Sequence, residues 1–355
     1  MSLEDKVTEA CHRIEELYYE TDGKCMISFS GGKDSTVVLA LVKLCEELYT
    51  IPDGGIPAVF GNTGIELGIT YEFVRWVAAN WYKNMVVIKP EVSFDWVVKN
   101  YGKPIFSKIR SDNLEMWQSG KRYLNLIKRM IVGVDNKGNR SRKTKLADRD
   151  IHALHDDFPI KATAKCCKYL KKEPFKKYMK ENGILGVATG ERMAEGGARE
   201  MNANRRAHDA NSRICTTVSN GLIKKRPIID WTNEEVEEFI EQYNVPLSEA
   251  YTKYGFKRTG CMACPYANNI ALGDDLRYLH DHEPNRYKAA MHWLKDVYIA
   301  ENVILPFDEE YEKEREKMWR EVYEPMRQEM LRKYRPNSKL IKDQEQTTIF
   351  EFLGE

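Results

Sequence analysis

Apolar and polar residues follow two different rhythms over the first two-thirds of the chain. Short apolar runs predict four buried strands, at residues 24–29, 57–60, 85–88 and 184–188. Other stretches place apolar residues at helical spacing, as in residues 36–48, where Val37, Leu41 and Cys45 share one face, and in residues 1–23. This alternation predicts an α/β fold with a doubly wound, mostly parallel sheet. Such sheets bind ligands beyond the carboxyl ends of their strands.

Boundary signals support the predicted helices. Thr232, with Glu235 three residues later, forms a capping box. Pro174 marks a helix start, because proline is favoured in the first turn. Gly183 marks a helix stop before the fourth strand.

Two segments depart from this pattern. Residues 101–165 are polar and basic without a clear strand, so we expect an insertion in a first domain that spans residues 1–270. Residues 271–340 predict a charged helical region, and residues 341–355 a short tail. Between residues 121 and 150 the chain has ten Lys or Arg and three Asp. Such a stretch binds a nucleic-acid backbone or forms a solvated surface, and the sequence favours neither.

Composition limits the classes of protein to consider. The 355 residues carry a net charge of +1 and contain no apolar run of the roughly 18 residues that a membrane span needs. The N-terminus lacks the apolar segment of a signal peptide, so we expect a cytoplasmic protein. In a reducing compartment the eight cysteines suit metal binding or chemistry better than disulfides. We expect four histidines to lie on the surface: His152, His155, His280 and His282.

The most informative motif is Ser-Gly-Gly-Lys-Asp-Ser at residues 30–35. It lies between a predicted strand and a predicted helix, where backbone N–H groups and the helix dipole attract an anion. Glycine is needed there because a Cβ would block the phosphate or the turn. The spacing is not that of a Walker A loop. The motif predicts a phosphate-binding turn, and an ordinary strand–turn–helix corner is the alternative.

Two cysteine pairs form the second strong signal, Cys166 with Cys167 and Cys261 with Cys264. Four thiolates can hold one tetrahedral zinc ion or a [4Fe–4S] cluster. The side chains of adjacent cysteines diverge, which suits a cluster that offers a separate iron to each thiolate. We therefore favour the cluster over zinc.

The motifs together resemble known enzymes. The glycine loop is similar to the PP-loop of ATP pyrophosphatases, and the cysteine pairs resemble those of iron–sulfur adenylylsulfate reductases in the phosphoadenylylsulfate (PAPS) reductase family. Further similar stretches are Thr63-Gly64 with Glu66, residues 189–192 with Arg199, and residues 231–251. The resemblance implies an adenine nucleotide alpha-hydrolase-like fold that binds ATP, Mg²⁺ and a [4Fe–4S] cluster.

Two departures from the reductases indicate a particular branch of this family. No cysteine follows Cys264, whereas the reductases use a nucleophilic cysteine near the C-terminus, and the loop has the complete pyrophosphatase form. The chain is therefore most similar to the DndC/SspD-type enzymes of DNA phosphorothioation. The resemblance implies an AMP-forming, pyrophosphate-releasing sulfurtransferase that acts on a nucleic-acid phosphate, with DNA favoured and a cysteine desulfurase as sulfur donor. The alternatives are an adenylylsulfate or PAPS reductase that uses a partner's thiol, a tRNA thiolation enzyme, and a non-catalytic nucleotide-binding iron–sulfur module.

The resemblance also implies roles for single residues. Nucleotide contacts would come from Ser30, Gly31, Gly32, Lys33, Asp34, Ser35, Thr63, Gly64, Gly190 and Arg199. Three of the implied residues would be catalytic: Lys33 neutralises the leaving pyrophosphate, Asp34 binds Mg²⁺, and Arg192 binds phosphate. The metal ligands would be Cys166, Cys167, Cys261 and Cys264. Glu191 is either a second carboxylate near the metal or an arginine partner, and Cys215 could carry persulfide sulfur.

The end of the chain resembles peptides that dock into DNA sliding clamps. Gln346 would bond to the groove rim, and the anchors would be Ile349, Phe350, Phe352 and Leu353. A terminal helix that packs on its own domain is the alternative.

Overall fold

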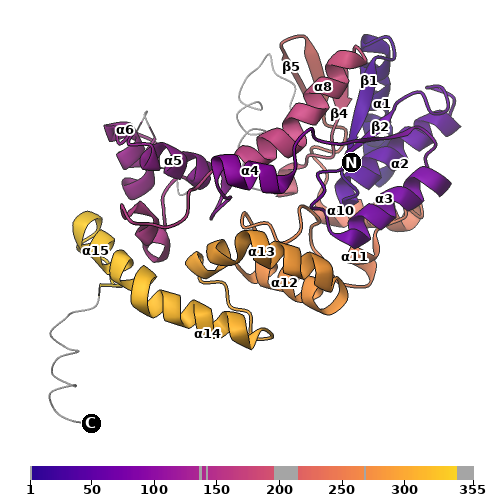
Figure 1. Ribbon diagram of the computed structural model, residues 1–355. Helices are drawn as coiled ribbons and strands as arrows, with labels where there is room; N and C mark the ends of the chain where they lie inside the picture. Colours follow the sequence, from indigo (N-terminus) through magenta and orange to yellow (C-terminus); the bar gives the residue numbers. More distant parts are fainter. Residues whose placement is uncertain (1, 136–137, 141–142, 196–214, 268, 342–355) are drawn as a thin grey trace, which may run out of the picture. The chain divides into compact units, whose positions relative to one another are not determined.

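The computed structural model describes residues 2–135, 138–140, 143–195, 215–267 and 269–341 (Figure 1). Its contacts divide the chain into two compact units, each built from two segments. The first unit contains Met1–Ser93 and Tyr169–Cys261, and the second contains Phe94–Lys168 and Met262–Glu355. The segment that we expected as an insertion therefore groups with the C-terminal helices, a division that differs from the contiguous domains expected from the sequence.

A six-stranded sheet forms the centre of the first unit, with strand order β3-β2-β1-β4-β6-β5. The strands are β1 (Cys25–Phe29), β2 (Ala58–Gly61), β3 (Met85–Ile88), β4 (Gly186–Ala188), β5 (Thr216–Ser219) and β6 (Leu222–Lys225). All neighbours are parallel except β5 and β6. Ile27 of β1 pairs with Ala58 on one side and with Ala188 on the other. The predicted mostly parallel α/β sheet is confirmed.

Helices cover both faces of this sheet, as a doubly wound fold requires. One face carries α1 (Leu3–Glu20), α2 (Lys33–Glu47), α3 (Gly68–Asn80) and α10 (Asn233–Gln242). Ile27 and Phe29 of β1 lie in the core beneath them. On the other face, α8 (Glu173–Glu181) packs Phe175 and Met179 near Met26 of β1. Alternate residues of β1 thus enter opposite cores.

The predicted helix boundaries in this unit are confirmed. Thr232 and Glu235 form the capping box at the start of α10. Pro174 lies in the first turn of α8, and Gly183 follows the end of that helix with a φ of 61°. The hairpin of β5 and β6 was not predicted.

The described part of the second unit is mainly helical. Its helices are α4 (Phe94–Tyr101), α5 (Lys108–Gln118), α6 (Leu124–Ile127), α7 (Lys165–Cys167), α12 (Asn269–His282), α13 (Pro284–Ala300), α14 (Glu309–Met318) and α15 (Glu324–Tyr334). Trp117 and Met130 of the basic segment are buried. Arg335, just after α15, donates hydrogen bonds to the carbonyl oxygens of Ile131 and Leu146. The basic segment therefore contributes to a packed core.

His152 lies inside the second unit, so the expectation of a surface histidine is wrong there. Its side chain is fully buried and contacts the rings of Phe106, Phe158, Trp319 and Tyr323. Burial lowers the pKa of His152 to about 4, so the imidazole is neutral near pH 7. His155 is half-buried, whereas His280 and His282 are exposed as expected.

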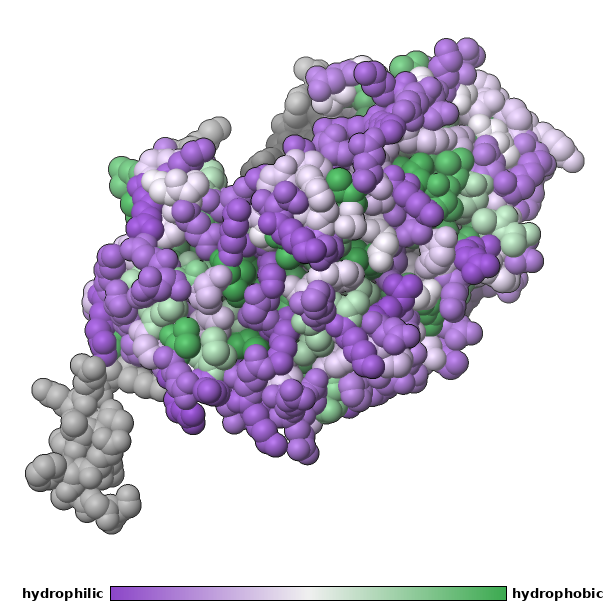
Figure 2. All heavy atoms as spheres, in the orientation of Figure 1, coloured by the Kyte–Doolittle hydropathy of each residue, from purple (hydrophilic) through white to green (hydrophobic). Residues whose placement is uncertain are grey.

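Polar side chains cover most of the face shown in Figure 2, with small apolar clusters between them. None of the helices within the described ranges is long and apolar enough to cross a bilayer.

Candidate nucleotide-binding site

The turn at residues 30–35 joins the end of β1 to the start of α2, as the sequence predicted. Gly31 has a φ of +71°, and a Cβ there would lie 3.0 Å from the Val74 side chain and 3.1 Å from that of Thr70. Gly32, which has no side chain to cap the helix, is the N-cap residue of α2. Both glycines therefore allow a tight turn that presents the first backbone N–H groups of a 15-residue helix.

Hydroxyl groups hold this turn in shape. The Ser30 N–H donates to Ser35 Oγ at 3.2 Å, and the two serine hydroxyls lie 3.0 Å apart. Ser35 Oγ donates to the Gly32 carbonyl oxygen at 2.8 Å. The Lys33 N–H donates to the Tyr251 hydroxyl at 3.1 Å. The turn is thus rigidified by its own side chains and by one tyrosine from a distant segment.

The loop that follows β4 contacts the turn at the topological switch point of the sheet, where successive strands are added on opposite sides of β1. β2 and β3 lie on one side of β1, whereas β4 lies on the other, and ligands bind at such a switch point. Gly190 follows β4, and a Cβ there would lie 2.7 Å from the backbone carbonyl carbon of Asp34 and 2.9 Å from the Ser35 nitrogen. The two sequence motifs are therefore in direct backbone contact.

Arg192 holds Asp34 in place. Its Nε lies 2.7 Å from Asp34 Oδ1, and its side chain is only 3% exposed. The same guanidinium donates to the Trp231 carbonyl oxygen at 3.3 Å and to Asn233 Oδ1 at 3.1 Å. The structure thus brings two predicted catalytic residues together, with Arg192 positioning the carboxylate.

Lys33 lies in the first turn of α2, where the helix dipole favours an anion. Its Nζ is 3.2 Å from Glu237 Oε1, and the Glu237 side chain is 64% exposed. Exposed ion pairs contribute only about 0–1 kcal/mol. The ammonium is therefore held weakly enough to move to a more strongly charged anion.

A cavity of about 390 Å³ opens beside the turn and includes Ser30 in its wall. Its wall contains apolar side chains and polar ones. The apolar residues include Met26, Phe60, Phe175, Met179, Val187 and Leu222, and the polar residues include Glu66, Thr70, Lys171, Lys172, Thr189, Lys224 and Thr259. The Oγ1 atoms of Thr70 and Thr189 are buried without a hydrogen-bond partner among the described residues. Buried hydroxyls normally find partners, so this wall suits a ligand with polar groups. The volume is within the range of small-molecule sites.

Thr63 and Gly64 follow β2 on the same edge of the sheet. Both the N–H and the hydroxyl of Thr63 donate to Glu66 Oε1, at 3.2 and 2.5 Å. Gly64 has a φ of +81°, with open space where a Cβ would be. Glu66 lines the cavity and forms an isolated antiparallel bridge with Cys261. This links one predicted metal ligand to the cavity wall.

Glu191 forms ion pairs with two basic side chains. Its carboxylate oxygens lie 2.5 Å from Lys224 Nζ and 2.7 Å from Arg226 Nε. Burial acts to raise the pKa of Glu191, but the two ion pairs outweigh it and the pKa lies below its usual value. Of the two roles considered for Glu191, the structure therefore supports the ion pair, formed with Lys224 and Arg226.

Three of the four paired cysteines lie near Tyr266, a half-buried residue of the second unit. The Tyr266 hydroxyl donates to the Thr163 carbonyl oxygen at 3.3 Å. Burial raises the pKa of Tyr266, and the nearby thiols of Cys166, Cys167 and Cys264 raise it further. Among the described residues, no three His, Cys, Asp or Glu side chains are arranged to hold a metal ion. The ligand roles of these cysteines stay a prediction.

Some predicted positions lie outside the described residues, namely Arg199, Gln346, Ile349, Phe350, Phe352 and Leu353. Cys215 is described and half-buried, with its Sγ 3.5 Å from Thr216 Oγ1. A persulfide role for it stays a prediction.

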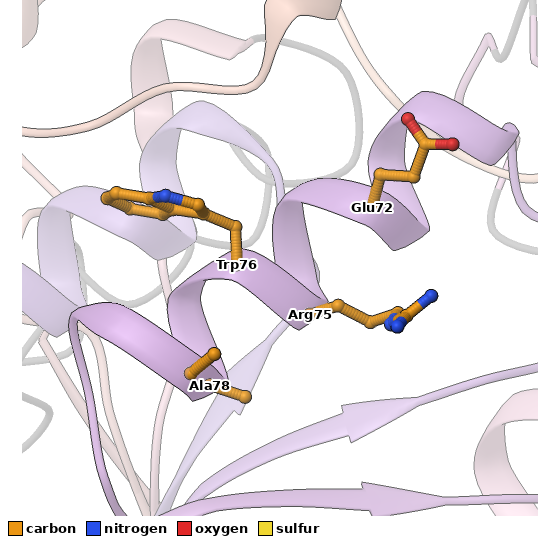
Figure 3. A pocket seen from close by; sticks show the side chains of 5 residues that line it. Glu72, Arg75, Trp76 and Ala78 are labelled. Carbon is orange, nitrogen blue, oxygen red and sulfur yellow. The ribbon is translucent and has the colours of Figure 1, made fainter.

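The sequence reasoning missed several residues of the cavity and the turn. Lys171 and Lys172 lie in the segment after the first cysteine pair, so their spacing from that motif could have indicated them. Tyr251 belongs to a stretch that was singled out only for its family resemblance. A separate hollow of about 580 Å³ lies along α3, where Glu72, Arg75, Trp76 and Ala78 come from the same helix (Figure 3). The residues that line this hollow all belong to α3, whereas several segments contribute polar side chains to the cavity beside the turn.

Comparisons with known proteins identify the family of this chain. The family model described as "Phosphoadenosine phosphosulfate reductase domain" matches residues 24–128 and 123–267. An uncharacterized protein of Methanocaldococcus jannaschii is 25% identical over 272 residues, which are 75% of this chain but 47% of that protein. A phosphoadenosine 5'-phosphosulfate reductase of Vibrio parahaemolyticus is 25% identical over 263 residues, which are 73% of this chain and 75% of that enzyme. A crystal structure of the PAPS reductase from Candida auris aligns with a TM-score of 0.38 and 19% identity, covering 67% of this chain and 81% of that one. The family model matches well over half of the residues of this chain, and the chain therefore belongs to the phosphoadenosine phosphosulfate reductase domain family.

Proposed function

We propose that this chain is an ATP-dependent sulfurtransferase that cleaves ATP between the α and β phosphates and activates a nucleic-acid phosphate for sulfur insertion. The observation that carries the proposal is the complete Ser-Gly-Gly-Lys-Asp-Ser turn at the start of α2, beside a cavity that is lined by both apolar and polar residues. An adenosine nucleotide needs both kinds of contact, because its base is flat and weakly polar and its phosphates are charged.

The residues around the turn would divide the work of phosphate chemistry. Backbone N–H groups of the turn would bind phosphate oxygens. Lys33 would leave its exposed ion pair with Glu237 and neutralise the leaving pyrophosphate. Asp34, fixed by Arg192, would offer a carboxylate oxygen to Mg²⁺.

The base and sugar would occupy the cavity. Phe60, Phe175 and Met179 would contact the base, and the unpartnered hydroxyls of Thr70 and Thr189 would bond to polar groups of the ligand. Lys171 and Lys172 would add positive charge at the wall.

The cysteines fit an iron–sulfur cluster by their chemistry. Thiolates are the usual ligands of such clusters, and three of the thiols lie near half-buried Tyr266. Cys166, Cys167, Cys261 and Cys264 would hold the [4Fe–4S] cluster, which supplies iron sites able to carry electrons or sulfur when bound. A cysteine desulfurase would deliver the sulfur.

The nucleic-acid acceptor is supported by charge. Lys121, Arg122 and Lys128 are exposed on the second unit, and contacts of this kind bind a phosphate backbone in a salt-dependent way. We favour DNA, and tRNA is the alternative acceptor.

The decisive experiment incubates the anaerobic protein with ATP, Mg²⁺, a cysteine desulfurase with cysteine as its substrate, a thiol reductant, and either DNA or tRNA. AMP and pyrophosphate, with sulfur incorporated into the nucleic acid, are the expected products. Formation of ADP and phosphate, or no turnover with either acceptor, would refute the proposal. The Asp34→Asn variant should lose AMP formation while keeping its iron and sulfide content.

A second candidate is an adenylylsulfate or PAPS reductase that uses a partner's thiol. It is favoured by the match to the Vibrio reductase over 73% of this chain. Release of sulfite from adenylylsulfate or PAPS in the presence of thioredoxin, without AMP formation from ATP, would select it.

A further inference from the structure

Two hydroxyl groups lie directly over the glycine turn. The Tyr251 phenol oxygen accepts the Lys33 N–H at 3.1 Å and lies 3.0 Å from Thr259 Oγ1. A Cβ placed on Gly32 would be 3.3 Å from the phenol oxygen and 3.2 Å from Thr259 Oγ1. Both hydroxyls therefore lie next to the turn that would bind phosphate, within reach of a ligand held there.

The surrounding structure holds this pair in place. Tyr251 belongs to α11 (Glu249–Thr252), whose N-cap Ser248 bonds to the Ala250 N–H. Ser248 Oγ also donates to the Ile69 carbonyl oxygen of α3 at 3.4 Å. Tyr251 therefore approaches the turn from a short helix that is anchored to α3.

Thr259 connects the pair to the cavity wall. Thr259 and Gly260 both line the cavity, and the next residue, Cys261, bridges to Glu66. A continuous path thus runs within the first unit from the turn, through two hydroxyls, to the segment that carries Cys261.

The chemistry of a phenol suits a ligand that is an anion. A hydroxyl group has one hydrogen to donate and two lone pairs to accept. The Lys33 N–H uses one lone pair of the Tyr251 oxygen. When the Thr259 hydroxyl is the donor in its 3.0 Å contact with Tyr251, the Tyr251 hydrogen is left for a phosphate oxygen. That bond is charge-assisted and about twice as strong as a neutral one.

We propose that Tyr251 is a positioning residue for the phosphate chain, donating its hydroxyl hydrogen to a phosphate in the turn, and that Thr259 acts through Tyr251 by orienting that hydroxyl. The proposal rests on the proposed function only in requiring that the turn binds a nucleotide's phosphates. It assigns phosphate recognition to a segment that has no glycine-loop signature.

The test compares ATP with adenosine as ligands in calorimetry at a fixed salt concentration. Tyr251→Phe should weaken ATP binding about five- to ten-fold, because a charge-assisted bond is lost. The affinity for adenosine should not change, because adenosine has no phosphate. A purely structural role of Tyr251 would weaken both ligands.

Thr259→Val tests the dependence of one hydroxyl on the other. Alone it should weaken ATP binding by about two- to three-fold, and it should add nothing in the Tyr251→Phe background. Tyr254→Phe, on the same segment but outside these contacts, is the matched control and should bind ATP normally.

Several results would overturn the inference: unchanged or tighter ATP binding by Tyr251→Phe, equal losses for ATP and adenosine, additive effects of the two variants, or no binding of ATP by the unaltered chain. Because no turnover is needed, a chain that binds ATP with the expected losses but forms no AMP supports the inference and refutes the proposed function.

Discussion

Gly190 offers the sharpest test of the site, because its backbone packs against the backbone of the phosphate turn. In the Gly190→Ala variant the new Cβ would lie 2.7 Å from the Asp34 carbonyl group, whereas ordinary contacts begin near 3.4 Å. One of the two loops must therefore move by about 0.7 Å. The atoms in the way are backbone atoms, so no side-chain rotation can relieve the clash.

The displacement should affect both stability and function. Overpacking a well-packed contact costs about 1–3 kcal/mol, so the unfolding midpoint of the first unit should fall. A misplacement near 1 Å can lower a rate by about 100-fold. We therefore expect the variant to lose on the order of ten- to 100-fold in kcat/KM for ATP.

The assay combines urea unfolding with ATP calorimetry and AMP formation. Gly260→Ala is the control for stability, because a Cβ at Gly260 meets no atom within 4 Å. The control should unfold at the normal urea concentration. If Gly190→Ala unfolds like the control and binds ATP like the unaltered chain, the contact between the two loops does not position the turn.

Three other changes have expected outcomes that urea unfolding can measure. Arg192→Met leaves Asp34 without its buried partner and should destabilise the first unit by about 3 kcal/mol, whereas Arg192→Lys keeps the charge and should lose less. His152 has a folded-state pKa of about 4, against 6.5 in the unfolded chain. As the pH falls from 6.5 to 4, only the unfolded chain takes up this proton, so the second unit should lose up to about 3 kcal/mol, and His152→Gln should abolish that loss. Arg335→Met removes an ion pair with Asp148 and donors to three backbone carbonyl groups, which should destabilise the second unit by about 3 kcal/mol; an unchanged midpoint would show that these bonds contribute nothing.

The sequence could predict what is encoded locally. The first four strands and the glycine turn follow from short apolar runs and from residues that are adjacent in the chain. The hairpin of β5 and β6 also had a local signal, the Asn220-Gly221 pair, whose φ angles of 51° and 76° match a two-residue turn. It was missed because its strands, Thr-Thr-Val-Ser and Leu-Ile-Lys-Lys, are not continuous apolar runs.

The contacts that shape the site are not local. Arg192 and Asp34 are separated by 158 residues, and the periodicity of neither segment indicates that they pair. The family resemblance implied that Arg192 binds phosphate, and that role stays a prediction. Its contact with Asp34 depends on the sheet order, which sets β4 beside β1.

The burial of His152 could not be predicted from local sequence either. A histidine in a polar, basic segment carries no local sign of burial, and of the four rings around His152, Phe158 alone lies within ten residues of it in the sequence. Trp319 and Tyr323, which are two of these four rings, come from the C-terminal helical region. The grouping of two distant segments into one unit was therefore beyond the reach of local patterns.

The ion pairs around the turn limit the number of positive charges that could attract the triphosphate of ATP. Arg192 is paired with Asp34, and Lys224 is paired with Glu191. A helix N-terminus contributes only about half a positive charge, which is too little for three phosphates. On the proposed function, the remaining attraction would come from Mg²⁺, from Lys33 and from the lysines of the cavity wall, of which Lys171 and Lys172 lie four and five residues after Cys167. A cysteine motif that is followed so closely by cavity lysines would then give a physical reason for the glycine turn and the cysteine pairs to occur in the same chain.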